Sequence, residues 1–313
     1  MDKPVDRQTA ARFLAERYGP DAVEITELDG GDWSRAFAFR IENRDLVVRF
    51  GRYGEAYLKD RKAIAFAGPD LPVPAVMEIG EAYGVFYAIS ERYFGAFLET
   101  LDAQGWRKLM PALLRGLDHL REAEAPGSGV EWASEDVSAP LRWRQWLVES
   151  LEDRPGAQVG GWRASLRETP AIEEIFVSGE RALRSLLPDC PEMRHVIHRD
   201  LLNRNVLVAH DASRLQAVFD WGCSLAGDFL YELAWFTFWA PWYPALNALD
   251  VRRVFQDHYR SLGLEVENFD RRLACYEIHI GLEHIAYTAF TGRKADQQDV
   301  VRRTIQVLES TSL

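Results

Sequence analysis

Strand-like alternation of apolar and polar residues fills the first ninety residues of this chain and then stops. Short apolar runs separated by turn residues continue to about residue 91, and beyond it apolar residues recur at helical spacing. Runs joined by short turns pair as antiparallel hairpins. The sequence therefore predicts two lobes, a strand-rich one over 1–91 and a mainly helical one over 92–313, joined by a short hinge because no Gly/Ser linker separates them.

The N-terminal lobe is expected to form one antiparallel sheet of five strands with a helix inserted. A short helix is predicted over 5–18. The inserted helix is predicted over 55–67, where the apolar residues have amphipathic spacing and prolines follow. The five strands are expected at 23–28, 35–41, 45–50, 76–82 and 84–90.

The C-terminal lobe is expected to be helical with a few short strands, so the fold class is α+β. A loop is predicted over 126–140. Short strands are expected at 194–198, 205–208 and 215–219. Helices are expected at 99–122, 141–153, 170–187, 228–240, 250–262, 270–290 and 294–310.

Charge and cysteine content narrow the possible partners. The 313 residues hold 37 Lys and Arg against 48 Asp and Glu, a net charge of −11, which argues against nucleic-acid binding. Three widely spaced cysteines form no disulfide framework, which favours a reducing compartment, and the N-terminus has no signal-peptide core. The apolar stretch 229–246 is too short and too interrupted by proline to span a bilayer. We expect a cytoplasmic protein, a monomer, without membrane or nucleic-acid partners.

The chemistry concentrates in the segment 195–222. Asp200 is followed by Asn205 five residues later and by Asp220 fifteen residues after that. If 205–208 and 215–219 form a hairpin, Asn205 and Asp220 lie side by side. Hard divalent ions take such oxygen ligands, and phosphoryl transfer needs these ions plus one carboxylate near the attacking hydroxyl. Ordinary turn chemistry is the alternative interpretation, since Asp and Asn favour turns.

The same segment resembles the catalytic and metal-binding loops of the aminoglycoside phosphotransferase and protein-kinase-like superfamily. The kinase signatures H-R-D-L-x-x-x-N and D-F-G stand here as 198–205 and Asp220-Trp221-Gly222. The resemblance is collinear along most of the chain and is greatest to members that act on hygromycin B. It is carried further by the segments 30–39, 59–81, 190–200 and 217–242.

This resemblance implies a bilobal protein-kinase-like fold and an ATP- and Mg²⁺-dependent O-phosphotransferase. The implied acceptor is a hydroxyl of a cationic aminoglycoside, hygromycin B or a relative, and the implied outcome is antibiotic resistance. Asp200 would orient the acceptor hydroxyl and take its proton, while Asn205 and Asp220 would hold two Mg²⁺ ions. His198 would be a scaffold residue, and Asp228 would accept backbone N–H bonds and brace the catalytic loop.

The N-terminal lobe would supply the nucleotide site. Gly31 and Ser34 lie between two strands, where kinases place a lid over the phosphates, although a plain hairpin turn explains them as well. Arg49 stands where kinases carry their phosphate-binding lysine, and Asp60 where they carry its glutamate partner. Arginine is longer than lysine and aspartate shorter than glutamate, so the salt bridge can keep its span. A weak surface ion pair is the alternative.

Two further features follow from the resemblance. The Ser90 carbonyl and the Arg92 N–H would bond the adenine edge. Too few residues separate Asp220 from Asp228 for an activation loop that phosphorylation could regulate, so Arg199 is expected to pair locally.

A polycationic acceptor needs carboxylates and a wall for its sugar rings. The candidates are Glu232, Trp235, Trp239, Glu277 and Glu283. Core packing explains aromatic residues at helical spacing equally well, and Glu232 could instead brace the catalytic loop together with Asp228.

Two other functions remain open. The chain could phosphorylate another small alcohol, such as a macrolide, a choline-like amino alcohol or a sugar metabolite, because the catalytic residues serve all of these. It could also be a nucleotide-binding pseudokinase, given the Arg49 and Asp60 replacements. A hydrolase is not supported, because the nucleophile-elbow, zinc-protease and P-loop motifs are all missing from the sequence.

Overall fold

A computed structural model describes residues 5–29, 31–133, 141–154 and 156–311. The chain divides into two compact units. Unit 1 contains residues 1–119 and 200–224, and unit 2 contains 120–199 and 225–313. The helical C-terminal half predicted from the sequence is thus shared between the units, because the segment 200–224 packs with the N-terminal residues. The predicted division at residue 91 therefore does not follow the packing.

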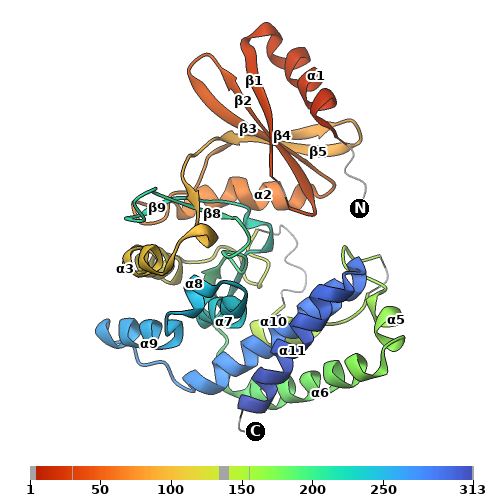
Figure 1. The fold of residues 1–313 in the computed structure, drawn as a ribbon, viewed down its shortest axis with the longest axis vertical. Coiled ribbons are helices and arrows are strands. Elements are labelled where there is room, and N and C mark those ends of the chain that lie inside the picture. Colours follow the sequence, from red (N-terminus) through yellow and green to blue (C-terminus); the bar gives the residue numbers. More distant parts are fainter. Residues whose placement is uncertain (1–4, 30, 134–140, 155, 312–313) are drawn as a thin grey trace. The chain divides into compact units, whose positions relative to one another are not determined.

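Unit 1 is built on the predicted antiparallel five-stranded sheet (Figure 1). Its order is β1-β2-β3-β5-β4, with every neighbouring pair antiparallel. The strands are β1 Ala22–Leu28, β2 Ser34–Ile41, β3 Arg44–Gly51, β4 Val76–Ala82 and β5 Val85–Glu91.

Because side chains alternate along each strand, the two faces of this sheet carry different kinds of residue. In β3, Leu46, Val48 and Phe50 are buried on one face, where Phe13 of α1 (Arg7–Tyr18) packs edge-on against Phe50 with ring centroids 5.3 Å apart. Side chains alternate along a strand, so Arg49 projects from the opposite face. There it meets α2 (Gly54–Ala63). One face is therefore core, and the other presents a charged group.

A second, three-stranded sheet in unit 1 carries the catalytic segment. Its order is β6-β8-β9, with β6 Ala96–Phe97, β8 Val206–Val208 and β9 Leu215–Val218. The remaining elements of this unit are η1 Gly19–Asp21, η2 Ile64–Phe66, η3 Leu98–Thr100 and η5 Trp221–Cys223, with most of α3 Ala103–Glu122.

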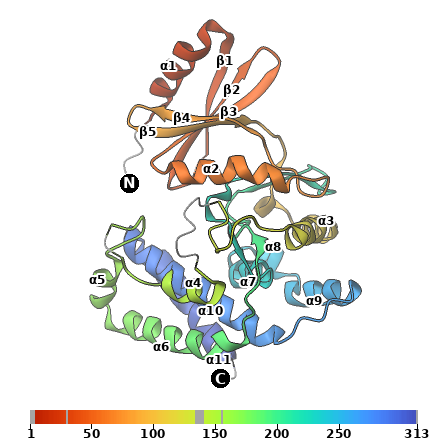
Figure 2. The same cartoon turned by 180° about the vertical axis from the view of Figure 1, so that it is seen from behind.

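Unit 2 is a helical assembly around α10 (Phe269–Thr291), which packs against α5, α6, α7 and α11 (Figures 1 and 2). The burial of α10 all round explains its lack of a polar face: thirteen of its residues are buried. The other elements are α4 Trp143–Glu149, α5 Trp162–Arg167, α6 Pro170–Leu186, η4 Leu187–Asp189, α7 Leu230–Trp239, η6 Ala240–Trp242, α8 Pro244–Asn247, α9 Val251–Ser261 and α11 Lys294–Ser310.

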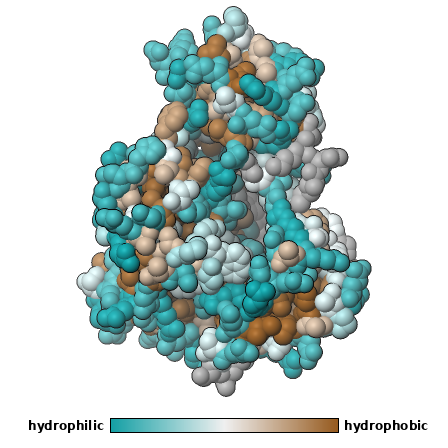
Figure 3. Space-filling view, viewed as in Figure 1, coloured by the Kyte–Doolittle hydropathy of each residue, from teal (hydrophilic) through white to brown (hydrophobic). Residues whose placement is uncertain are grey.

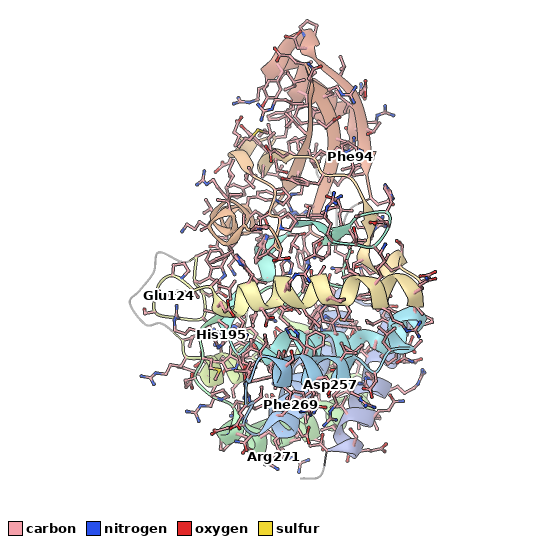
Figure 4. All side chains as sticks on the ribbon, turned by 90° about the vertical axis from the view of Figure 1, so that its left-hand side faces the viewer. Phe94, Glu124, His195, Asp257, Phe269 and Arg271 are labelled. Carbon is pink, nitrogen blue, oxygen red and sulfur yellow. The ribbon has the colours of Figure 1, made fainter. Side chains whose placement is uncertain are left out.

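A two-stranded sheet in unit 2 leads into the catalytic motif. In it, β7 (His195–Ile197) pairs with β10 (Leu225–Gly227). His195 is structural: its Nδ1 lies 2.6 Å from the Arg121 carbonyl oxygen, and it forms an isolated bridge with Glu124, beside which it lies in Figure 4.

The surface of the protein is largely hydrophilic on the side shown in Figure 3. Among the helices that the structure describes, none is long and apolar enough to cross a membrane. Part of the predicted 126–140 loop, residues 134–140, lies outside the described residues.

Gly227 of β10 provides a test of the packing in unit 2. A Cβ at this position would lie 2.5 Å from the Trp143 ring. We expect Gly227→Ala to lower the free energy of unfolding by about 1–3 kcal/mol through overpacking. Gly31→Ala is the matched control, because no atom lies within 4 Å of its added Cβ. Chemical denaturation of both variants measures the difference, and equal midpoints would contradict the packing described.

Candidate active site

Asp200 and Asn205 lie together in unit 1, as the motif predicts. The Asn205 side-chain amide donates to the Asp200 backbone oxygen at 2.8 Å and to Asp200 Oδ2 at 2.9 Å. Asn203 Nδ2 is 3.3 Å from the same carboxylate oxygen. Because the Asn205 nitrogen is used in this way, its Oδ1 is the atom left to act as a ligand. The turn thus orients a carboxylate and an amide oxygen at one place.

The predicted hairpin brings Asp220 to the same end of the sheet. Val206 pairs with Val218, and the Phe219 N–H donates to the Asn205 carbonyl at 3.0 Å. Asp220 follows directly in the left-handed conformation, with φ 62° and ψ 61°. Aspartate tolerates this conformation better than most residues. Its side chain is 45% exposed, so the carboxylate remains accessible.

Arg49 and Asp60 form the predicted salt bridge, and it is buried. The Arg49 and Asp60 side chains are 13% and 5% exposed. Arg49 Nη2 donates to Asp60 Oδ2, Arg49 Nη1 lies 3.5 Å from Asp220 Oδ1, and the guanidinium lies over the Tyr57 ring at 5.2 Å. The weak surface pair considered as the alternative is therefore excluded.

Asp60 also holds the backbone of the loop that follows Asp220. Its Oδ1 accepts the Trp221 N–H at 2.7 Å. Burial raises the pKa of the Asp60 carboxyl, while the Arg49 guanidinium and the Trp221 N–H oppose that rise. One carboxylate thus joins Arg49, the candidate phosphate-binding arginine, to the residue after Asp220.

Lys59 is a site residue that the sequence interpretation did not assign. Its ammonium donates to the Gly222 carbonyl at 3.2 Å and to the Ser224 carbonyl at 2.9 Å. Its position directly before Asp60 was the only sequence signal. Two consecutive residues of α2 therefore hold the loop from 221 to 224.

The donor set suits Mg²⁺ and a nucleotide together. Hard cations of this kind bind oxygen and are held by one or two carboxylates plus substrate phosphates. Asp220 and Asn205 Oδ1 supply such oxygens, and Arg49 supplies a positive charge for phosphate. Within the described parts of the chain, no group of three or more His, Cys, Asp or Glu residues could hold a metal alone. Asp220 and Asn205 would thus offer two protein oxygens, and substrate phosphates are the usual further ligands of such an ion.

The remaining nucleotide-site candidates are Gly31, Ser34, Ser90 and Arg92, which lie in or next to β2 and β5. Ser34 begins β2 opposite Gly51, and Gly31 has open space around its Cα. Ser90 lies in β5 opposite Val47. The Arg92 N–H, predicted to bond adenine, donates instead to the Asp45 carbonyl at 3.0 Å. Gly30, which belongs to the predicted lid segment, lies outside the described residues.

Glu232 is a brace and not a wall of an acceptor site, which corrects its assignment to substrate binding. It is 4% exposed, and its Oε1 accepts the backbone N–H groups of His198 and Arg199, the latter at 3.1 Å. His198 is fully buried, in keeping with a scaffold role. The helix position of Glu232 places a carboxylate under two successive amides, which explains why a charged residue occurs in an otherwise apolar helix.

Asp228 does not brace the catalytic-loop amides, which corrects a second prediction. It accepts the Leu230 N–H at 3.1 Å, the Arg272 guanidinium at 2.7–3.0 Å and the Tyr276 hydroxyl at 2.5 Å. Asp228 therefore ties the start of α7 to α10, and Glu232, one turn further on, takes the role predicted for it.

Among the other acceptor-site candidates, the two tryptophans pack against each other and the two glutamates are paired. Trp235 is buried, and its ring centroid lies 5.9 Å from that of Trp239. Within the part of the chain that the structure describes, neither buried indole Nε1 has a hydrogen-bond partner. Glu277 is paired with Arg303 at 3.4 Å. Glu283 is paired with Arg199 at 2.6 Å, so Arg199 does pair locally.

Comparison with known proteins fits this geometry. The family model described as a phosphotransferase enzyme family matches residues 24–264. The chain belongs to this phosphotransferase family. Over 306 residues it is 29% identical to hygromycin-B 4-O-kinase of Escherichia coli, with 95% of this chain and 84% of the relative covered.

Solved structures agree with the family over the whole chain. A thermostable mutant of aminoglycoside phosphotransferase APH(4)-Ia, in ternary complex with AMP-PNP and hygromycin B, matches with a TM-score of 0.81 and 26% identity, covering 96% of this chain and 98% of that one. The crystal structure of APH(4)-Ia matches with a TM-score of 0.83 and 25% identity, covering 98% and 100%. The predicted kinase-like fold is confirmed, and the chain is an O-phosphotransferase.

The buried Arg49–Asp60 pair gives this phosphotransferase a testable weak point. We expect Asp60→Ala to lower the free energy of unfolding by about 3–5 kcal/mol, because it leaves the buried guanidinium unpaired. Asp70→Asn is the control: it breaks the half-exposed Arg115–Asp70 pair in the same unit and should cost less than about 1 kcal/mol. Urea unfolding of the two variants measures the two losses of free energy of unfolding. Similar losses for Asp60→Ala and Asp70→Asn would contradict the burial of the Arg49–Asp60 pair.

Glu232 should make stability depend on pH. Burial raises its pKa from 4.5 to about 7, while the two N–H donors lower it. Between these values the folded protein holds a proton that the unfolded chain has released, so stability falls as pH rises from 4.5 to 7. The change is on the order of 3 kcal/mol. Glu232→Gln should remove this slope in denaturation curves from pH 5 to 8; parallel curves for the variant and the original chain would refute it.

Proposed function

We propose that this phosphotransferase moves the γ-phosphoryl group of ATP, with Mg²⁺, to a hydroxyl of hygromycin B or a closely related aminoglycoside. The observation that carries the proposal is the convergence of Asp200, Asn205 and Asp220 beside the buried Arg49–Asp60 pair. The named acceptor is supported by the likeness to hygromycin-B 4-O-kinase. Antibiotic resistance is the expected consequence in the cell, and we expect a cytoplasmic monomer.

The chain's own residues would share the work as follows. The oxygen of the acceptor hydroxyl bonds to the γ-phosphorus, and Asp200 accepts the proton of that hydroxyl. At the same time the bond from the γ-phosphorus to the bridging oxygen of ADP breaks. Asn205, by holding the Asp200 carboxylate, fixes the direction of that acceptor oxygen. Arg49 stabilises charge on the phosphates. Bound Mg²⁺, held by Asn205 and Asp220, would neutralise charge on the phosphate oxygens.

The environment of Arg49 supports catalysis over mere nucleotide binding. The guanidinium is held by Asp60, and Asp60 also holds the metal-loop backbone at Trp221. The Arg and Asp that stand in place of Lys and Glu thus still meet as a pair. This arrangement favours an active enzyme over the pseudokinase.

The acceptor is tested by ADP release with Mg·ATP against hygromycin B, other aminoglycosides, a macrolide and choline. We expect turnover with hygromycin B. Asp200→Ala should lower kcat by about 10²–10⁴-fold, because it removes the base, while ATP still binds. Asp257→Asn, on the exposed side of α9, is the matched control and should leave kcat unchanged.

Three outcomes would contradict parts of the proposal. Full turnover by Asp200→Ala would remove Asp200 from the mechanism. Turnover with choline or a macrolide alone would replace the acceptor and keep the reaction. Nucleotide binding without turnover on any acceptor would favour the pseudokinase.

A further inference from the structure

The residue before the catalytic aspartate has a backbone conformation that side chains with a Cβ rarely adopt. Arg199 has φ 66°, in the left-handed region. Its N–H donates to Glu232 Oε1 at 3.1 Å. Arg199 is joined directly to Asp200, so its backbone angles set the direction in which the chain enters the catalytic loop. Something in the structure must hold an arginine in this conformation.

The Arg199 side chain is fixed on three sides within unit 2. Its Nη2 donates to both carboxylate oxygens of Glu283, at 2.9 and 2.6 Å. Its guanidinium lies over the rings of Trp146 at 4.4 Å and of Tyr231 at 5.4 Å. The side chain is only 11% exposed. A buried ion pair with two aromatic walls leaves this arginine little freedom.

His279, one turn before Glu283 on α10, lies beside the Glu283 carboxylate. His279 Nδ1 lies 3.8 Å from Glu283 Oε2. The two ring nitrogens of His279 contact the Tyr231 hydroxyl at 2.9 Å and the Ser150 hydroxyl at 2.8 Å. Burial acts to raise the pKa of Glu283, yet Arg199 and His279 bring it below its usual value. This carboxylate is therefore committed to Arg199 and is not offered to a cationic acceptor.

We propose that the Arg199–Glu283 pair is a positioning device that holds Arg199 in the left-handed conformation from which Asp200 follows. Glycine would adopt this conformation through its own freedom, whereas here a side-chain clamp imposes it. Arg199 and Glu283 are positioning residues, since neither is assigned a contact with the reacting atoms. The catalytic part of this inference rests on the proposed phosphoryl transfer.

The test compares two double variants that differ by one methyl group. Arg199→Gly/Glu283→Gln and Arg199→Ala/Glu283→Gln both lack the guanidinium, and glutamine avoids leaving a buried unpaired charge. Only alanine has a Cβ that resists the left-handed conformation. We expect kcat of the alanine variant to lie about 5- to 30-fold below that of the glycine variant, with similar KM for ATP. Equal kcat values, after correction for the folded fraction, would overturn the positioning role.

A second readout needs no substrate. The glycine double variant should melt at a higher temperature than the alanine one. At the exposed helical position Arg302 of α11 the order should reverse, with Arg302→Ala melting above Arg302→Gly. The same order at both positions would overturn the clamp. If the double variants do not fold, the single Arg199→Gly and Arg199→Ala variants are compared in the same way.

The two readouts separate this inference from the proposed function. Loss of all turnover in the unmodified chain would reject the proposed acceptors, while the melting order would still test the left-handed conformation at position 199 that the inference requires. Turnover in the unmodified chain with no difference between glycine and alanine would reject the inference alone.

Discussion

The Asp60 carboxylate is the constraint on which the candidate nucleotide site depends. It is buried, and its two oxygens have different partners: one pairs with the Arg49 guanidinium and the other accepts the Trp221 N–H. A buried charge needs this degree of satisfaction, since an unpaired one is costly. Because Arg49 comes from the sheet and Trp221 from the loop after β9, one side chain links the Arg49 guanidinium to the segment that carries Asp220, the proposed metal ligand.

In unit 2, carboxylates in the same way hold His198 and Arg199, the residues that lead up to Asp200. Glu232 satisfies two successive backbone amides, at His198 and Arg199, with one buried oxygen, and Glu283 neutralises the Arg199 guanidinium. The two residues that precede Asp200 are therefore held by carboxylates from α7 and α10, helices far away in the sequence. Preorganisation of this kind lowers the cost of orienting a reacting group.

The sequence predicts the local elements and the motif well, because both depend on short-range patterns. The five strands of the large sheet and the Asp200, Asn205 and Asp220 cluster follow from alternation, turn residues and spacing. The strands β6 and β10 were not predicted, since two or three residues become a strand only through a distant partner. For the same reason the bracing role predicted for Asp228 falls to Glu232, which the sequence offered as an acceptor residue or as a brace. The sequence shows two acidic residues one helical turn apart, and only packing shows that Arg272 and Tyr276 occupy the first.

We propose that Asp60 couples the position of Arg49 to that of the loop 220–224. The direct measurement is a double-mutant cycle of Arg49→Lys and Asp60→Asn, read as Mg·ATP affinity by calorimetry. The account predicts that the two substitutions together weaken binding much less than the sum of their separate effects, with a coupling free energy of about 0.5–3 kcal/mol. Additive effects would show that Arg49 and Asp60 act independently and would contradict the account.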